Sequence, residues 1–306
     1  PTQAATDFAA TALFSPTYDI NPFQSRAASV VSFPAAVLAS AMGFCAGSFT
    51  LDAACASSLY AVRLACEQLA LKKANIMIAG GVSRPSSLYT QVGFSQLQAL
   101  SPSGRCAPFD HRADGLVVGE GAGILVLKRL EDALDRQDKI FGVIRAVGLS
   151  NDIDGNLVAP ASEGQVRAMT EAYRTAGWTP DMIQTMECHG SATIKGDQTE
   201  LTSIGSLLTE FDRNDAGFSI GSVKSNIGHL LTAAGAAGLI KTLMGMEDRT
   251  LPPSLNYEKA PPDSRLNTMA VRVQKKPAPW KPDPNTGIRR AAVSAFGFGG
   301  IDAHLL

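Results

Sequence analysis

The sequence is poor in charge, in histidine and in long hydrophobic runs, and each shortage excludes a class of protein. Charged residues make up 18% of the 306 residues and nearly cancel, leaving a net charge of −1 at pH 7. A balanced charge without like-charge runs argues against nucleic acid as a partner. No apolar stretch approaches the roughly 18 to 20 residues that a membrane helix requires, so we predict no membrane span.

The five cysteines are an odd number and lack the close pairing typical of metal sites. They are Cys45, Cys55, Cys66, Cys106 and Cys188. A reducing compartment fits this pattern better than a disulfide framework, and we expect the cytoplasm. The first residues show neither the basic patch nor the apolar core of an export signal. We also predict no metal site, because no cluster of ligands has a convincing spacing.

Hydrophobic residues make up 45% of the chain, and strand and helix signals alternate along most of it, which favours an α/β architecture. Strands are predicted at residues 49–53, 76–79, 121–127, 140–149, 183–188, 218–223 and 291–296, with a last strand after a glycine turn. Helices are predicted at residues 57–71, around 130–134, at 162–176 with Gly177 as the cap, and at 230–246.

Two longer patterns complete the organisation. Residues 49–71 and 218–243 share the order strand, polar turn and apolar helix, a coarse similarity that gives weak support to an internal duplication. Residues 251–290 are rich in proline and charge, and we predict an irregular surface excursion there. Residues 1–24 receive no assignment.

One cysteine and two histidines lie at predicted turns that follow strands and are far apart in the sequence. Cys55 lies in residues 52–58 (DAACASS), His189 in residues 187–193 (ECHGSAT) and His229 in residues 224–229 (KSNIGH). A helix start exposes Cys55 to the positive end of the helix and its free amides, which favours the thiolate. A lone cysteine is more often a packing residue, and a lone histidine can cap a helix. Two of the four histidines in the chain lie at such turns, which favours acyl chemistry on the Cys55 thiol.

These segments resemble the signature motifs of the β-ketoacyl synthases, the condensing enzymes of fatty acid and polyketide synthesis. Residues 52–58 match the nucleophile motif, residues 187–193 the first histidine motif, and residues 224–229 the lysine and second histidine motif. Supporting matches lie at residues 99–102, 112–115, 119–122 and 294–304. The resemblance extends from about residue 30 to the end of the chain, and it is most like the ketosynthase domains of type I polyketide or polyunsaturated fatty acid synthases.

The resemblance implies a reaction and a division of labour. The reaction is a decarboxylative Claisen condensation of a cysteine-bound acyl chain with a malonyl-type thioester, giving a β-ketoacyl thioester and carbon dioxide. Cys55 takes the acyl chain from a carrier-protein thioester, and His189 and His229 stabilise the enolate left by the departing carbon dioxide. Lys224 pairs with Glu200 beside the histidines and orients groups rather than transferring protons.

Further roles follow from the same resemblance. The backbone amides of Cys55 and Phe298 form an oxyanion hole, and Phe298 is also a gate. Ser191 and Thr193 hydrogen-bond the phosphopantetheine arm of an acyl carrier protein or carrier domain, which brings the substrates, so no bound cofactor is expected. A homodimer is the expected assembly. His111 and His304 are assigned structural or surface roles, and Cys45, Cys66, Cys106 and Cys188 are assigned to packing.

The implied fold is thiolase-like, a five-layered αβαβα sandwich of two similar halves. We expect a single ketosynthase domain over residues 1–306, in which residues 1–139 are the remainder of the amino-terminal half and residues 140–306 are the carboxy-terminal half. About a quarter of a full domain is expected to be missing ahead of Pro1.

Two positions depart from the motifs. Ala192 stands where the first histidine motif usually has glycine, and Ile301-Asp302 stands where Thr-Asn or Asn-Asn is usual. Two alternatives stay open. One is an acyl-transferring relative that does not condense, and the other is a non-catalytic partner subunit that shapes the pocket, although such partners typically lack the nucleophile.

Overall fold

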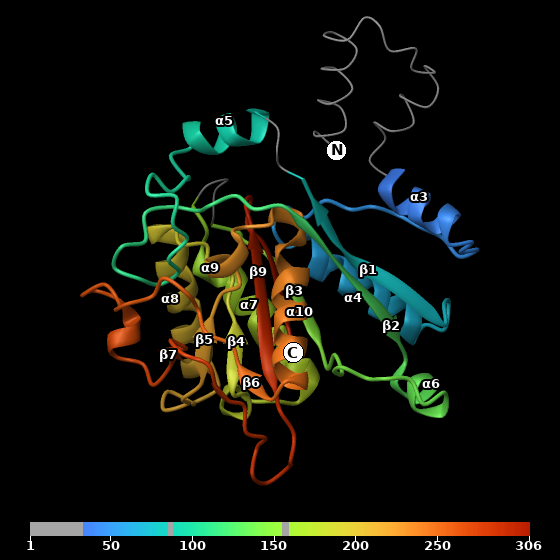
Figure 1. The fold of residues 1–306 in the computed structure, drawn as a ribbon. Helices are drawn as coiled ribbons and strands as arrows, with labels where there is room; N and C mark the ends of the chain where they lie inside the picture. Colours follow the sequence, from blue (N-terminus) through green and yellow to red (C-terminus); the bar gives the residue numbers. More distant parts are fainter. Residues whose placement is uncertain (1–32, 85–87, 155–158) are drawn as a thin grey trace, which may run out of the picture.

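The computed structural model describes residues 33–84, 88–154 and 159–306, which form stacked layers of sheet and helix (Figure 1). The smaller sheet pairs β1 (Ile76–Ser83) with β2 (Gly121–Lys128) in antiparallel register. Helices α4 (Ser57–Ala70) and α10 (Ala234–Glu247) lie between this pair and a larger sheet, since each contacts both. Residues 1–24, which have no assignment from sequence, lie outside the described ranges.

The larger sheet is mixed and has six strands. Their order is β3 (Val147–Asn151), β10 (Ile301–Leu305), β9 (Ala291–Gly297), β4 (Thr185–Glu187), β5 (Ser219–Gly221) and β7 (Arg272–Val273). Strands β9, β4, β5 and β7 are mutually parallel, whereas β10 is antiparallel to both of its neighbours. Central strands covered by helices on both faces should be apolar throughout, and the first six residues of β9 are all buried.

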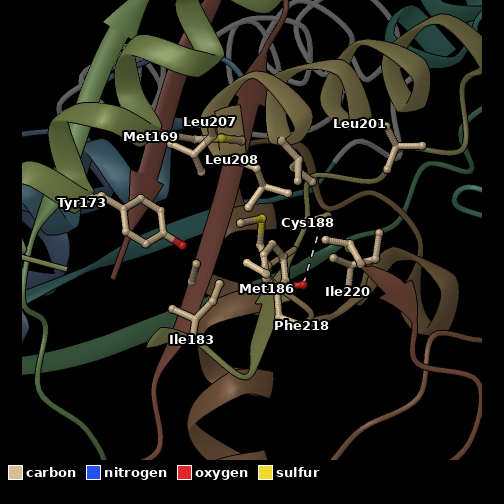
Figure 2. Packing of buried hydrophobic residues seen from close by; sticks show 14 of the residues in the cluster. Met169, Tyr173, Ile183, Met186, Cys188, Leu201, Leu207, Leu208, Phe218 and Ile220 are labelled. Carbon is tan, nitrogen blue, oxygen red and sulfur yellow. Dashed lines mark hydrogen bonds between the residues drawn. The ribbon is translucent and has the colours of Figure 1, made fainter. Parts of the chain in front are cut away.

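Helices α7 (Ser162–Ala176) and α8 (Ile194–Glu210) cover the other face of the large sheet. Their buried side chains, Met169, Tyr173, Leu207 and Leu208 among them, pack against Met186 of β4 and Ile220 of β5 (Figure 2). The remaining elements are α3 (Phe33–Ala41), α5 (Leu88–Gln96), α6 (Leu130–Asp135), α9 (Lys224–Ile227), the strand pair β6 (Thr250–Leu251) and β8 (Ala278–Pro279), and short 3₁₀ turns at Pro180–Met182, Leu231–Ala233 and Arg265–Asn267.

The described residues thus form four layers: the β1–β2 pair, α4 with α10, the large sheet, and α7 with α8. Within these ranges no helix packs on the outer face of β1–β2, where the fifth layer of the predicted sandwich belongs. In the same ranges no helix is both long and apolar enough to cross a membrane.

The close approach of α4 and α10 depends on small residues, as the Ala- and Gly-rich sequence of α10 indicates. A Cβ at Gly235 would lie 2.7 Å from the Leu59 side chain, so only glycine fits there. The Ala236 amide next to it donates to the Ser58 hydroxyl at 2.9 Å. These two helices begin just after the segments that carry Cys55 and His229, and their packing therefore brings the two segments together.

Several predicted elements are confirmed. Helix α7 ends where Gly177 takes a left-handed conformation at φ +68°, and its N–H caps the Arg174 and Tyr173 carbonyls. Strands β9 and β10 are joined by a turn at residues 298–300, as the glycine pattern predicted. Strand β1 differs slightly, because it continues through Gly80 and Gly81, where it was expected to end.

Three predictions are wrong. Residues 49–53 form no strand, because in the described residues no neighbouring strand supplies a hydrogen-bonded partner; only an isolated bridge marks Ala53. The strand expected at residues 140–149 starts only at Val147. The proline-rich segment 251–290 is no mere surface excursion, since it contributes edge strand β7 and the buried Trp280.

Candidate active site

The nucleophile candidate Cys55 lies on a tight turn at the amino end of α4. Ala54 has a left-handed φ of +47°, which lets the chain reverse just before the cysteine. The Ser57 hydroxyl holds the turn closed by accepting from the Ala53 amide at 2.9 Å and donating to the Ala54 carbonyl at 2.6 Å. Cys55 is 4% exposed and lines a cavity of about 330 Å³.

The Cys55 thiol is protonated at neutral pH, contrary to the expectation that the helix start would favour the thiolate. Burial raises its pKa to about 11. The positive charge of Lys224 and the backbone amides of Phe298 and Cys55, which hydrogen-bond the sulfur, oppose that rise without cancelling it. The same two amides were predicted to form the oxyanion hole, and both lower the pKa of the Cys55 thiol.

His189 and His229 line the same cavity, and backbone contacts fix their tautomers. The Nδ1 atom of His189 accepts from the Phe296 amide at 3.3 Å, and Nδ1 of His229 accepts from the Leu231 amide at 3.1 Å. Burial, and then the charge of Lys224, lowers the pKa of both imidazoles well below 6.5. Each ring is therefore neutral, and its remaining proton resides on Nε2 as a donor.

The two imidazoles lie edge to face, with ring centroids 5.2 Å apart and planes at 79°. Both follow the ends of parallel strands or the turns beyond them, as predicted: His189 comes after β4 and His229 after α9. Two neutral donors at one cavity can stabilise a single developing oxyanion without an intervening proton transfer.

Lys224 and Glu200 meet at His189, but not as the direct ion pair that was predicted. Among the described residues no Lys224–Glu200 contact lies within 4 Å. Instead, the buried Lys224 ammonium donates to the His189 carbonyl, while Glu200 accepts from the amides of His189 and Gly190, both at 2.7 Å. The carboxylate oxygens are occupied by the backbone, so the two side chains hold His189 from opposite sides. Burial lowers the pKa of Lys224 and raises that of Glu200 to about 7.

Asp197 is a supporting residue that the motifs did not reveal. Its carboxylate accepts from the Ala192 amide at 3.1 Å and from the Phe109 amide at 2.6 Å, and burial raises its pKa to about 7. Ala192 itself has a φ of +64°, the conformation for which the motif's usual glycine is suited. A signal was present in the sequence, because Asp197 and Glu200 are three residues apart on one helical face of α8.

Residues 115–119 link the two histidine turns. The Gly115 amide donates to the Ala192 carbonyl at 3.0 Å, and the His229 amide donates to the Val117 carbonyl at 2.7 Å. The Gly119 amide returns a bond of 3.0 Å to the His229 carbonyl. This stretch, recognised only as a supporting motif, positions both histidines through their backbones.

Ser191, Thr193 and Phe298 also face the cavity. The Ser191 and Thr193 hydroxyls lie 2.9 Å apart and hydrogen-bond each other. Phe298 is half-buried on the glycine turn, with Gly299 and Gly300 at φ +85° and +72°, and its ring lies 5.7 Å from that of Phe94 on α5. The predicted site residues are thus brought together from five separate segments of the chain.

The other histidines and cysteines lie outside the cavity lining. His111 contacts the Asp110 carboxylate at 3.1 Å near the surface, and the buried His304 hydrogen-bonds Ser294 at 3.0 Å. Cys188 is buried among core side chains (Figure 2). Cys45 is exposed, so its predicted packing role is wrong.

Comparison with known proteins agrees with the motifs. The family described as "Beta-ketoacyl synthase, N-terminal domain" matches residues 6–133, and "Beta-ketoacyl synthase, C-terminal domain" matches residues 141–258. One of the phenolphthiocerol/phthiocerol polyketide synthase proteins of Mycobacterium tuberculosis is 41% identical over 261 residues, which is 85% of this chain and 14% of that protein.

Solved structures with the same fold include two ketosynthases. The ketosynthase from module 6 of the bacillaene synthase of Bacillus subtilis 168 has a TM-score of 0.86 and 36% identity, and the match covers 90% of this chain and 50% of that one. The oxazolomycin ketosynthase domain of Streptomyces albus JA3453 has a TM-score of 0.87 and 35% identity, covering 90% and 49%. The fold is the thiolase-like one that was predicted. The chain belongs to the β-ketoacyl synthase family, among ketosynthases of the type I polyketide or polyunsaturated fatty acid synthase kind.

Proposed function

We propose that the chain is an acyltransferase that condenses a cysteine-bound acyl chain with a malonyl-type thioester, releasing carbon dioxide and forming a β-ketoacyl thioester. The observation that carries the proposal is the pair of neutral imidazoles whose Nδ1 atoms accept backbone N–H groups. Their Nε2–H groups are thereby left as donors at the cavity that Cys55 also lines. Two donors and one thiol in one cavity suit a reaction with an enolate and an acyl thioester.

The first half-reaction loads Cys55. The thiol attacks the thioester of an acyl carrier, the carbon–sulfur bond to the carrier breaks, and the thiol proton passes to the departing carrier sulfur. Because the pKa of Cys55 is about 11, the proton must leave as the new bond forms. The amides of Cys55 and Phe298 stabilise the negative charge on the carbonyl oxygen during this attack.

The second half-reaction uses the histidines. Loss of carbon dioxide from the malonyl group leaves its bonding electrons as an enolate, so no strong base is required. The Nε2–H groups of His189 and His229 donate to the enolate oxygen, and the carbanion attacks the acyl carbonyl on Cys55. The cysteine departs as a thiolate and regains a proton from solvent. Neutral imidazoles suit this role, since they donate hydrogen bonds to the enolate oxygen without transferring a proton to it.

The substrates and partners belong to the same proposal. The malonyl and acyl groups arrive on the phosphopantetheine of a carrier protein or carrier domain, whose arm contacts Ser191 and Thr193 at the cavity, and the chain works as a homodimer. The chain spans only 14% of the length of its mycobacterial polyketide synthase relative, so further domains can supply the carrier.

A two-step experiment tests the function. Intact-mass measurement after incubation with an acyl-carrier thioester should show one acyl group on the chain, and malonyl-carrier should then remove it as β-ketoacyl-carrier. Cys55→Ala should abolish both steps, whereas Cys45→Ala, at the exposed cysteine, should leave them intact. Acyl loading without β-ketoacyl product would favour the non-condensing acyltransferase, and no loading at all would favour the pocket-shaping partner.

A further inference from the structure

Two carboxyl groups lie together beneath the glycine turn that carries Phe298. Asp302, on β10, is 1% exposed, and Asp152 follows β3, the strand next to it. A Cβ at Gly164 of α7 would lie 2.2 Å from Asp152 Oδ1 and 2.5 Å from Asp302 Oδ2, so both oxygens face the same point. Those two oxygens are buried, and no described group donates a hydrogen bond to either. Two carboxylate oxygens so close repel each other unless one of the two groups carries a proton.

The charged groups around the pair do not neutralise it. On α7, the Glu163 carboxylate adds negative charge near the pair. The Arg167 guanidinium is bound to Glu163 at 2.8 Å and donates to the Asn151 carbonyl at the end of β3. From α4, the Tyr60 hydroxyl faces the pair but donates to the Ser150 carbonyl at 3.2 Å. Burial and the neighbouring Asp152 raise the pKa of Asp302 to about 9.

The pair is in contact with the turn, and the turn is in contact with the nucleophile. The Asp152 amide donates to the Gly300 carbonyl at 2.7 Å, and its side chain lies so near Gly300 that a Cβ there would be 2.5 Å from Asp152 Cβ. At the other end of the turn, a Cβ at Gly297 would lie 3.1 Å from the Cys55 nitrogen. Between them, the Phe298 amide hydrogen-bonds the Cys55 sulfur.

We propose that Asp152 and Asp302 share one proton and together act as a positioning pair for the Phe298 turn, keeping its amide on the Cys55 sulfur. The role in acyl transfer rests on the proposed function. When the shared proton is lost, two adjacent carboxylates repel each other, and the turn packed on Asp152 moves with it. The amide of Phe298 then leaves the sulfur, and the Cys55 thiolate loses a stabilising donor.

The test measures alkylation of Cys55 by iodoacetamide between pH 7 and pH 10, read by peptide mass. The full chain is compared with Asp302→Asn, in which an amide replaces the shared proton, and the exposed Cys45 serves as the internal control. The ratio of the variant's Cys55 rate to the wild-type rate should be near one at pH 7 and rise about tenfold at pH 10, the scale of one hydrogen bond to a charged group. Because both proteins contain the same thiol, a change of the ratio with pH reports the effect of the carboxyl pair on that thiol.

Asp152→Asn provides an independent second variant, since an amide at either position replaces the proton of the pair with a hydrogen-bond donor, and it should give the same rising ratio. The proposal would be overturned if the alkylation-rate ratio of both variants changed by less than about twofold between pH 7 and pH 10. It would also be overturned if Asp152→Asn showed the same pH dependence of Cys55 alkylation as the wild type. Alkylation requires only the thiol, so a chain that fails to load acyl groups, and thus defeats the proposed function, still yields a clear result here.

Discussion

Asp302→Asn should make the stability of the chain less dependent on pH, and the structure gives the magnitude. Asp302 is buried beside Asp152, and its pKa rises from 3.8 to about 9 on folding. Between these values the native state keeps a proton that the unfolded state releases. The contribution of Asp302 to stability is therefore greatest below pH 3.8 and falls as the pH rises towards 9, by up to about 1.4 kcal/mol per pH unit. An asparagine at this position has no proton to lose.

The difference accumulates over an accessible range. From pH 5 to pH 8, the free energy of unfolding of Asp302→Asn should gain about 4 kcal/mol relative to the wild type, three units at the full slope. Urea unfolding at each pH, followed by circular dichroism, measures this difference directly. The amide also keeps the shape of the carboxyl group and can donate to Asp152, so the folded structure should be retained.

Asp283→Asn is the matched control. Asp283 is partly exposed and accepts hydrogen bonds from Thr286, which lower its pKa, so it titrates below the tested range and its variant should follow the wild-type curve. If the curves for Asp302→Asn and the wild type run parallel within about 1 kcal/mol from pH 5 to pH 8, Asp302 is ionised in the native state and the shared proton does not exist.

Four further predictions concern the reaction. Peptide mapping after acyl loading should find the label on Cys55 alone, and a label mainly on Cys188 would refute the assignment of Cys55 as the nucleophile. Cys55→Gln should lose condensation yet keep malonyl decarboxylation. Replacing His189 or His229 by alanine should slow carbon dioxide release on the order of 100-fold or more, the cost of losing an oxyanion donor, and unchanged release in both variants would locate the enolate elsewhere. Phe298→Ala should impair acyl loading more than decarboxylation, with little change in melting temperature because the side chain is only half-buried. A large drop in melting temperature with equal loss of both activities would show that Phe298 is an ordinary core residue.

The sequence predicted best those parts of the fold that local signals control. Helix α7 ends at Gly177 because only glycine adopts its left-handed conformation without cost, and the pattern around Phe298 predicted the β9–β10 turn for the same reason. The prediction at residues 49–53 was wrong, because a short segment with strand-like composition forms a strand only where another strand supplies hydrogen-bond partners. Strand β7 was missed because its two residues lie within a proline-rich stretch and are recruited by β5.

At the site, the motifs identified which side chains gather but not how they are held. Cys55, His189 and His229 were found because their residue types are rare and chemically specific. Glu200 was misjudged, since the family resemblance implied Lys224 as its partner, whereas its oxygens bind two backbone amides. Backbone donors are invisible in a sequence, and for this reason Asp197 escaped notice as well.

The departures from the family motifs are more informative about this chain than the matches are. Ala192 keeps the left-handed backbone that glycine would adopt freely, at φ +64°, and the Asp197 carboxylate that binds its amide supplies part of the compensation. Asp302 introduces a buried acid next to Asp152, and the only way to avoid two adjacent negative charges is to retain a proton. Ala192 lies on the turn that carries His189, and Asp302 lies on β10, next to the turn that carries Phe298. In this chain, Asp197 and the Asp152–Asp302 pair therefore support both segments without lining the cavity.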